Sequence, residues 1–207
     1  MVTLYLASTS PARLATLKQV GLNPVTVSHR VDEELLVKQA EKDGPLSAPS
    51  IVQLLAQAKA EDAVTDTMTG VIIGGDSVFE VDGKIFGKPH TPERARERWL
   101  MQRGKTGVLH SGHWVIRVNN GHMVNAVGKA SQASVTFRSD ISDGDIDTYI
   151  ATGEPLSVAG AFTIDSLGAA FIDSITGDPY TVIGLSIATV RELIEQLGLS
   201  YTDLWAT

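Results

Sequence analysis

The order of apolar and polar positions along the chain predicts an alternation of strands and helices. Residues 3–8 form a short apolar run that predicts a strand, and a tight turn follows it. Residues 13–22 then show helical spacing, and Gly21 is expected to cap the carboxyl end of that helix. A second strand is expected to begin at Asn23. The beginning of the chain therefore predicts a strand, a helix and a second strand.

The next segment, residues 32–49, is charged and rich in turn-forming residues. It has no sustained periodicity beyond residues 35–40, so we expect a long loop that contains one helical turn. Apolar residues then recur at helical spacing in an alanine-rich stretch, and Ser50 is available as an N-cap. We therefore expect a helix from Ser50 to Val64.

A strand and a hairpin are expected in the middle of the chain, followed by a helix. Residues 71–75 are a continuous apolar run, and the Asp-Gly pair within residues 81–84 supplies the turn of the hairpin. Thr91 is a suitable helix cap, and Pro92 suits the first helical position. This helix should run to about Arg103.

Two longer strand-like segments, residues 112–118 and 130–137, flank an Asn-Asn-Gly turn and should form an antiparallel pair. The remaining elements are a capped helix, a strand and an amphipathic helix before Gly198, over residues 142–152, 168–175 and 187–197. Helices alternate with strands early, and hairpins occupy the middle. We therefore expect an α/β fold with a mixed, twisted sheet and flanking helices.

Length and composition are typical of a globular protein. The 207 residues fit a single domain, residues 1–207, with room for two lobes. Hydrophobic residues make up 43% and charged residues 20%, so neither disorder nor a fibrous protein is indicated. No apolar stretch approaches the roughly 20 residues that span a bilayer, and Met1 leads directly into a strand-like segment. We expect no membrane partner and a cytoplasmic location.

Charge and cysteine content narrow the possible chemistry. The formal net charge of -7 argues against a protein that coats nucleic acid, because affinity for the phosphate backbone comes from Lys and Arg. The absence of cysteine excludes disulfides, thiolate metal sites and cysteine nucleophiles. An acidic chain that binds phosphates would be expected to use a divalent metal with a few placed cationic side chains.

The first candidate site is the point where the first strand leads into the first helix. Ser8, Ser10 and Arg13 lie there, together with the free backbone N–H groups of the helix start. These donors and the helix dipole favour an anion pocket. The alternative is that Ser10 caps the helix, Pro11 starts it and Arg13 is solvated.

The second candidate is Asp76, which follows the apolar strand and is expected at its carboxyl end. Ligands bind outside such ends in open α/β sheets, and the two preceding glycines would let a substrate approach closely. The carboxylate could hold a metal or orient a water molecule. Alternatively, Asp76 and Ser77 bond the backbone in a turn.

Three further charged residues have both a functional and an ordinary interpretation. Lys88 lies between Gly87 and Pro89, which suits a phosphate contact, or it is a surface lysine. Lys59 lies in an apolar helical stretch and is either functional or a snorkelling side chain. Glu33 is either a second metal carboxylate or one of three solvated acids.

Taken in order, these residues form a longer set of motifs: Ser-x-Ser-Pro-x-Arg, Val-Asp-Glu, Ala-Lys-Ala, Gly-Gly-Asp-Ser, Gly-Lys-Pro and Glu-Pro-Leu-x-x-Ala-Gly-Ala-Phe. With these motifs, the chain resembles the Maf family of nucleoside triphosphate pyrophosphatases from Leu4 to about Leu185. The resemblance implies an α/β fold like that of inosine triphosphate pyrophosphatases, with two lobes around a cleft, and a homodimer. It also implies cleavage of a nucleoside triphosphate to the monophosphate and pyrophosphate, dependent on Mg²⁺ or Mn²⁺.

The resemblance also implies roles for individual residues. Asp76 matches the proton acceptor, and Glu33 matches an acidic residue that helps with metal or water, so both are candidate metal ligands. The residues that match the phosphate-binding and catalytic set are Ser8, Ser10, Arg13, Lys59 and Lys88. The rival interpretation is a nucleotide-binding regulator of cell division without significant hydrolysis, a role also associated with the family.

The chain departs from the branch of the family that acts on dTTP and UTP. That branch typically has Arg-Arg after Ser-Pro, Thr after the acid, and Gly-Ile-Gln after Ala-Gly-Ala-Tyr. Ala12, Ser77 and Asp165 occupy the corresponding places here. A preference for thymine or uracil is therefore not implied. We take Asp165 as a candidate base contact, because its charge would favour N–H donors over carbonyl acceptors.

Overall fold

The computed structural model describes residues 2–206, and the chain divides into two compact units. The first consists of Met1–Asp76, Ser111–Ser131 and Gly184–Thr207, and the second of Ser77–His110 and Gln132–Ile183. These units correspond to the two expected lobes, whereas the cleft and the single domain stay predictions. No helix among residues 2–206 is long and apolar enough to cross a membrane.

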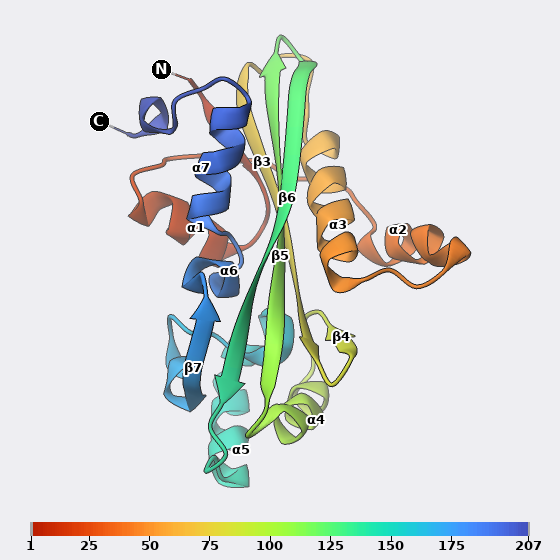
Figure 1. The fold of residues 1–207 in the computed structure, drawn as a ribbon, viewed down its shortest axis with the longest axis vertical. Helices are drawn as coiled ribbons and strands as arrows, with labels where there is room; N and C mark the ends of the chain where they lie inside the picture. The colour runs from red at the N-terminus through yellow and green to blue at the C-terminus, as the bar shows by residue number, and fades with distance from the viewer. Residues whose placement is uncertain (1, 207) are drawn as a thin grey trace. The chain divides into compact units, whose positions relative to one another are not determined.

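The strands form one mixed sheet in the order β2-β1-β3-β5-β6-β7, with β4 paired to β3 (Figure 1). β1 pairs in parallel with β2 and β3, whereas the β3–β4 and β6–β7 pairs are antiparallel. The strands are β1 (Leu4–Ala7), β2 (Val25–Thr26), β3 (Gly70–Val81), β4 (Lys84–Phe86), β5 (Thr106–Asn119), β6 (His122–Phe137) and β7 (Ile172–Gly177). The predicted α/β class with a mixed sheet is confirmed.

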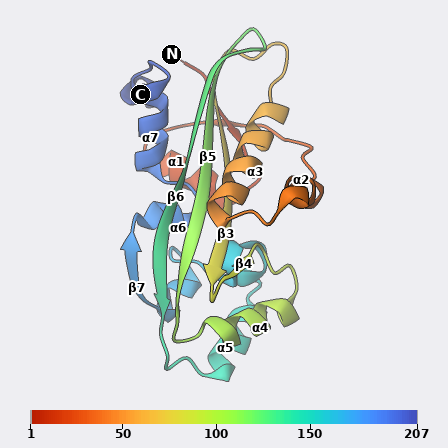
Figure 2. The ribbon, with the colours of Figure 1, turned by 45° about the vertical axis from the view of Figure 1, so that its right-hand side comes forward.

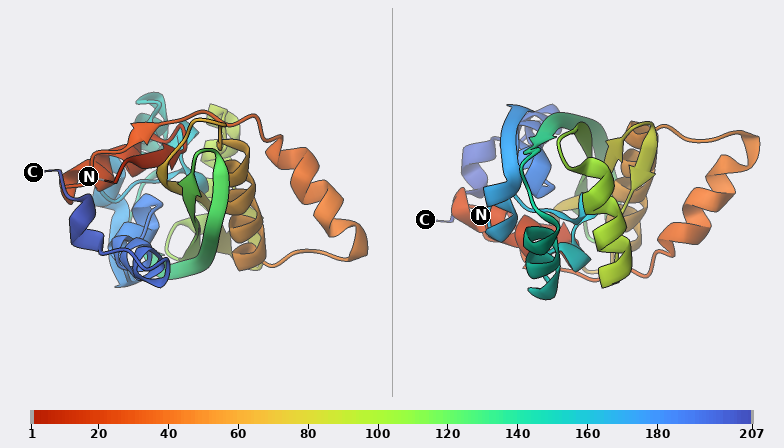
Figure 3. Two further views of the ribbon diagram at one scale, coloured as in Figure 1. Left: turned by 90° about the horizontal axis from the view of Figure 1, so that it is seen from above. Right: turned by 90° about the horizontal axis from the view of Figure 1, so that it is seen from below.

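Helices cover both faces of the sheet in the first unit (Figures 1 and 3). They are α1 (Pro11–Gln19), α2 (Glu33–Ala40), α3 (Ala48–Asp62) and α7 (Ile187–Gln196). Successive residues of β3 point to opposite faces, so Ile73 joins Leu17 of α1 and Leu193 of α7 in one cluster. Ile72 joins Ala60 of α3 in another. α2 lies beyond α3, on the side away from the sheet (Figure 3).

α3 lies close to the sheet because two glycines leave room on that face. A Cβ atom at Gly74 would lie 2.3 Å from the carbonyl oxygen of Ala56, and one at Gly112 would lie 2.1 Å from that of Val52. Any larger residue would push the helix away. This close approach brings Lys59 of α3 against β3.

The second unit has its own aromatic core. Its helices are α4 (Pro92–Gln102), α5 (Asp143–Ala151) and α6 (Pro179–Ile183), and Figure 2 shows α4 beside α5. The fully buried ring of Trp99 lies 5.5–5.6 Å from the rings of Phe137, Tyr149 and Phe171. Its Nε1 donates a 2.8 Å hydrogen bond to the carbonyl oxygen of Ala161. The indole is therefore surrounded by aromatic rings in edge-to-face contacts, and its one polar atom is hydrogen-bonded.

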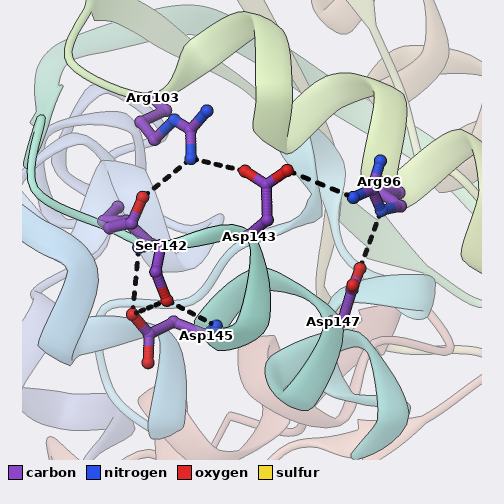
Figure 4. A network of polar contacts seen from close by, with 7 residues as sticks. Arg96, Arg103, Ser142, Asp143, Asp145 and Asp147 are labelled. Atoms are coloured by element: carbon purple, nitrogen blue, oxygen red, sulfur yellow. Dashed lines mark hydrogen bonds and ion pairs between the residues drawn. The ribbon is translucent and has the colours of Figure 1, made fainter.

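Ion pairs on the surface of the second unit join α4 to α5 (Figure 4). Arg96 contacts Asp143 and Asp147, and Arg103 also contacts Asp143. At the start of α5, Ser142 and Asp145 form a capping box. Because these side chains are largely exposed, solvent screening keeps the contribution of each ion pair to stability small.

Several local predictions are confirmed. The Asp82-Gly83 turn has φ values of 51° and 70°, and the Asn120-Gly121 turn has 47° and 75°. Positive φ at both positions is the two-residue hairpin geometry that these sequences favour. Two helices start at the expected caps, Thr91 and Ser142. Glycines with positive φ follow α1 and α7, also as expected.

Residues 32–49 are more helical than predicted. The segment contains α2, which Asp32 caps by accepting the backbone N–H of Leu35 at 3.0 Å, and a 3-10 turn follows it. α3 begins at Ala48 rather than at Ser50, because Ser47 is the cap and proline is compatible with the first turn. The expected loop and the expected helix start were therefore wrong.

The predicted strand at residues 168–175 begins too early. Leu167–Phe171 form a 3-10 helix, and β7 starts at Ile172. The N–H groups of Leu167 and Gly168 donate to the carboxylate of Glu154, which holds this part of the chain away from strand pairing. A side chain distant in sequence thus overrides the apolar pattern.

Candidate active site

The ammonium of Lys59 lies between two carboxylates of the first unit. Its Nζ is 2.6 Å from Oδ1 of Asp76 and 2.7 Å from Oε1 of Glu33. Lys59 and Asp76 are only 5% and 7% exposed, whereas the side chain of Glu33 is 46% exposed. Lys59 therefore does not snorkel to solvent, and the cluster is open to solvent on the side of Glu33.

The sequence predicted that Asp76 lies at the end of its strand, but the residue lies inside β3. β1 stops at Ala7, opposite Gly74, so Asp76 lies two residues beyond the last parallel pair. β3 continues because its later residues pair with β4 in the hairpin. The acid is therefore near the carboxyl edge of the parallel strands, as expected, although it belongs to a strand and not to a turn.

A hydrogen bond to α3 positions the segment before Glu33, so that its side chain reaches Lys59. It is the first residue of α2, after the cap residue Asp32. The backbone N–H of Arg30 donates a 2.6 Å hydrogen bond to Oδ2 of Asp62, the last residue of α3. This bond fixes the segment before α2 to the helix that carries Lys59.

The two glycines before Asp76 make room for other parts of the protein. The space at Gly74 is filled by the backbone of α3 at Ala56. A Cβ atom at Gly75 would lie 3.2 Å from Nε of Arg13. The expectation of a close substrate approach is therefore wrong for Gly74, where α3 fills the space, whereas for Gly75 it stays a prediction.

Arg13 is buried beside the start of α1, with 8% of its surface exposed. Its Nη1 donates to Oγ of Ser8 at 3.1 Å, and its Nε donates to the carbonyl oxygen of Gly184 at 2.8 Å. The backbone N–H of Ser10 also donates to Oγ of Ser8, at 3.2 Å. Arg13 is therefore not the solvated side chain of the alternative interpretation, and Ser8 links it to the turn before α1.

Ser10 and Pro11 have the local roles that the alternative interpretation gives them. Oγ of Ser10 accepts the backbone N–H of Arg13 at 3.4 Å as the N-cap of α1, and Pro11 is the first helical residue. Ser10 is half-buried. Its proposed contact with phosphate stays a prediction.

Burial and the neighbouring charges act in opposite directions on the pKa values of Asp76 and Arg13. Burial raises the pKa of Asp76 above that of an ordinary carboxyl, and the positive charges of Lys59 and Arg13 oppose this rise. Burial lowers the pKa of Arg13, and the charges of Asp76 and Glu33 oppose that change. A carboxylate whose pKa is raised is a stronger base, which suits removal of a proton from water.

The donor set fits a divalent cation that a phosphate ligand completes. Among residues 2–206 there is no group of three or more His, Asp or Glu side chains suited to a metal. Asp76 and Glu33 nevertheless both direct an oxygen at one positive group, Nζ of Lys59. Proteins commonly hold Mg²⁺ by one or two carboxylates together with substrate phosphates.

Lys88 and Asp165 belong to the second unit, whereas the other predicted site residues belong to the first. Lys88 follows β4 and is exposed. Asp165 is also exposed, in residues 163–168.

Sequence reasoning missed Glu154, which organises the segment around Asp165. Burial alone would raise the pKa of Glu154, but hydrogen bonds, chiefly from Thr163 and Ser166, outweigh burial and lower it to about 2. The donors to its carboxylate are the hydroxyls of Tyr149, Thr163 and Ser166 and the backbone N–H groups of Leu167 and Gly168. They lie 5 to 14 residues away in no periodic order, so the Glu-Pro-Leu motif was the only visible signal.

His29 is a second residue that sequence reasoning missed. It is half-buried, and its Nδ1 has no hydrogen-bond partner among the described residues. Burial and the charge of Lys59 lower the pKa of His29, against the charges of Glu33 and Asp62. The charges that act on the imidazole are therefore those of the lysine–carboxylate cluster and of Asp62. A lone histidine four positions before Glu33 gave no motif by which to find it.

Comparison with known proteins agrees with the motifs. A relative from Leifsonia xyli subsp. xyli is 55% identical over 208 residues, which cover 98% of this chain and 96% of the relative. One from Rhodococcus erythropolis is 44% identical over 213 residues, covering 100% and 98%. One from Corynebacterium diphtheriae is 43% identical over 204 residues, covering 99% and 98%. Each of these relatives is named a nucleoside triphosphate pyrophosphatase.

The sequence model of the family described as "Maf-like protein" matches residues 3–197. This match includes every residue of the lysine–carboxylate cluster and the whole of the Ser8–Arg13 turn. The expected resemblance is thereby confirmed, and the chain belongs to the Maf-like protein family.

Proposed function

We propose that this protein is a nucleoside triphosphate pyrophosphatase that releases a nucleoside monophosphate and pyrophosphate. The observation that carries the proposal is the buried Lys59 held between Asp76 and Glu33, in a chain similar along its whole length to relatives of that name. The cluster supplies a base and a cation in one place. Phosphoanhydride cleavage requires both, because a water molecule must lose a proton while negative charge on phosphate is neutralised.

The reaction forms a bond between a water oxygen and the α-phosphorus and breaks the bond from that phosphorus to the oxygen bridging the α and β phosphates. Asp76 accepts the proton of the attacking water, because its buried carboxylate has a raised pKa. Lys59 orients this carboxylate through its 2.6 Å contact. The leaving group is pyrophosphate, whose charge must be stabilised as it forms.

Asp76 and Glu33 are the residues that would hold Mg²⁺ or Mn²⁺. When bound there, such a cation would neutralise charge on the phosphate oxygens. Glu33 is suited to share it with a ligand because its side chain is half exposed.

The phosphate contacts are assigned to Ser8, Ser10 and Arg13 at the start of α1, and to Lys88 in the second unit. Backbone N–H groups and the positive end of the helix dipole support anion binding at α1. Lys88 supplies an exposed ammonium. Asp165, also exposed, is proposed to contact the base, where a carboxylate selects N–H donors.

The test is pyrophosphate release from a panel of nucleoside triphosphates with Mg²⁺ or Mn²⁺, before and after chelation with EDTA. We expect release by the wild type, loss of at least about 100-fold in kcat for Asp76→Asn, and loss on chelation. Asp66→Asn is the matched control, because Asp66 is an exposed acid of the same unit. A wild type that binds nucleotide but releases no pyrophosphate would support the nucleotide-binding regulator instead.

A homodimer and a cytoplasmic location are further proposals, both taken from the sequence-based expectations. Analytical ultracentrifugation of the purified chain tests the first, with a dimer as the expected species. Fractionation of cells tests the second.

A further inference from the structure

The segment between β4 and α4 carries Lys88 on a backbone with several fixed points. The backbone N–H of His90 donates to the carbonyl oxygen of Leu156 at 3.0 Å, and that of Gly160 donates to the carbonyl oxygen of Gly87 at 3.4 Å. The side chain of Lys88 is exposed and has no hydrogen-bond or ion-pair partner among the described residues. This is a free cation on a restrained backbone.

Arg98 of α4 supplies the remaining restraint, ten residues along the chain. Its Nη1 donates to the carbonyl oxygen of Gly87 at 2.5 Å, and its Nη2 donates to that of Lys88 at 3.5 Å. The guanidinium also lies over the ring of Phe86, 5.1 Å from the centroid. One planar group therefore joins three consecutive residues, from the end of β4 to Lys88.

Arg98 contacts the segment from Phe86 to Lys88, and other residues hold α4 in place. That helix is fixed through buried Trp99 and through the ion pairs of Arg96 and Arg103 with α5. Burial, followed by the nearby charge of Arg94, lowers the pKa of Arg98. Its two bonds to carbonyl oxygens offset that unfavourable setting, because carbonyl dipoles favour a guanidinium.

We propose that Arg98 is a positioning residue that holds the backbone of Gly87 and Lys88, so that the ammonium of Lys88 meets the phosphates of the substrate. The inference rests on the proposed function of Lys88. Two of the five N–H groups of Arg98 donate to these carbonyl oxygens, so we assign the guanidinium to holding the backbone and the phosphate contact to Lys88. A small displacement of a substrate-binding group lowers the rate even where no contact with substrate is lost directly.

The test is a double-mutant cycle on pyrophosphate release, with kcat and KM measured separately. As single substitutions, Arg98→Ala is expected to lower kcat/KM about tenfold, and Lys88→Ala is expected to lower it by a larger factor. In the Lys88→Ala background, Arg98→Ala should change kcat/KM by less than about twofold, because there is no longer an ammonium to position. An equal loss in both backgrounds, or no loss in the wild-type background, would overturn the proposal.

Two further variants separate positioning from a general loss of structure. Arg94→Ala removes the same charge from the same helix one turn earlier and should leave kcat/KM within about twofold of the wild type. Arg98→Lys keeps the charge but not the planar pair of donors, so it should restore only part of the rate. A full loss with Arg94→Ala would overturn the proposal, because the effect would then be one of net charge.

Thermal unfolding of each variant completes the test. Arg98→Ala should lower Tm by no more than about 4 °C, because the side chain lies outside the aromatic core. If the wild type itself released no pyrophosphate, the proposed function would be contradicted. Normal release that Arg98→Ala leaves unchanged would contradict only the role of Arg98.

Discussion

At the scale of single residues, Lys59 shows how burial changes the meaning of a charge. A lysine in an apolar helix stretch is most simply a snorkelling side chain, yet here the ammonium is buried against two carboxylates. The reason is that both partners lie in other elements, Asp76 in β3 and Glu33 in α2. Removing one member of such a buried group leaves the others without compensation.

We predict that Lys59→Met lowers the free energy of unfolding by about 3 kcal/mol, because the buried carboxylate of Asp76 loses its main partner. Denaturant unfolding at neutral pH measures this. The double variant Lys59→Met with Asp76→Asn should be less destabilised than Lys59→Met alone, since the uncompensated charge is gone. Equal or additive destabilisation in the double variant would count against a buried ion pair as the cause.

Glu154 leads to a prediction about pH. Its folded-state pKa of about 2 is below that of an unfolded glutamate, so its stabilising effect is fully present above the unfolded pKa of about 4.3. That contribution is lost as the pH falls toward 2. Glu154→Gln should therefore destabilise the protein by about 1–2 kcal/mol at pH 7, a figure reduced for partial solvent screening.

The destabilisation by Glu154→Gln should shrink when unfolding is measured between pH 5 and about pH 2, since the wild-type carboxyl then becomes protonated as well. Glu93→Gln is the control, because Glu93 is exposed at the start of α4. A difference between wild type and variant that is the same at every pH would show that packing, and not the charge, is what Glu154 contributes.

At the scale of elements, the distance between α3 and β3 decides the geometry of the site. Gly74 permits the backbone of α3 to approach, and Lys59 then reaches Asp76. We predict that Gly74→Ala destabilises the protein by at least about 2 kcal/mol and lowers pyrophosphate release, because a methyl group would meet the carbonyl oxygen of Ala56.

Gly144→Ala is the matched control for this glycine. Gly144 lies in α5, and the nearest atom to an added Cβ is 3.7 Å away, so alanine should be neutral or slightly stabilising there. Denaturant unfolding and the pyrophosphate assay are measured on both variants. Normal stability and activity of Gly74→Ala would show that α3 does not need its close approach.

The same scale shows where pattern reading succeeds and where it fails. Helix caps at Thr91 and Ser142 and the Asn120-Gly121 turn were predicted, because a few adjacent residues contain all the physical information for them. The 3-10 helix at Leu167–Phe171 was not, since the carboxylate of Glu154 holds it. Interactions with a residue distant in sequence leave no periodic signal.

At the scale of the whole molecule, each compact unit is assembled from separate stretches of sequence. The first unit combines three such stretches, and the second combines two. Each has its own buried apolar residues, with Leu17, Leu193 and Ile73 in the first and Trp99 and Phe137 in the second. Composition predicted that a core of this size was possible, but not which stretches would share it.

The sequence by itself determined the α/β class, the turns and caps, and the motifs by which Asp76, Glu33, Lys59 and Arg13 were chosen. Only the tertiary structure decided that the Lys59 ammonium lies between the two acids, that Arg13 is buried against Ser8, and that Asp76 lies within a strand. The physical reason is the distance along the chain over which each kind of interaction acts. Backbone propensities act over a few residues, whereas burial and ion pairing depend on which distant segments the packed core brings into contact.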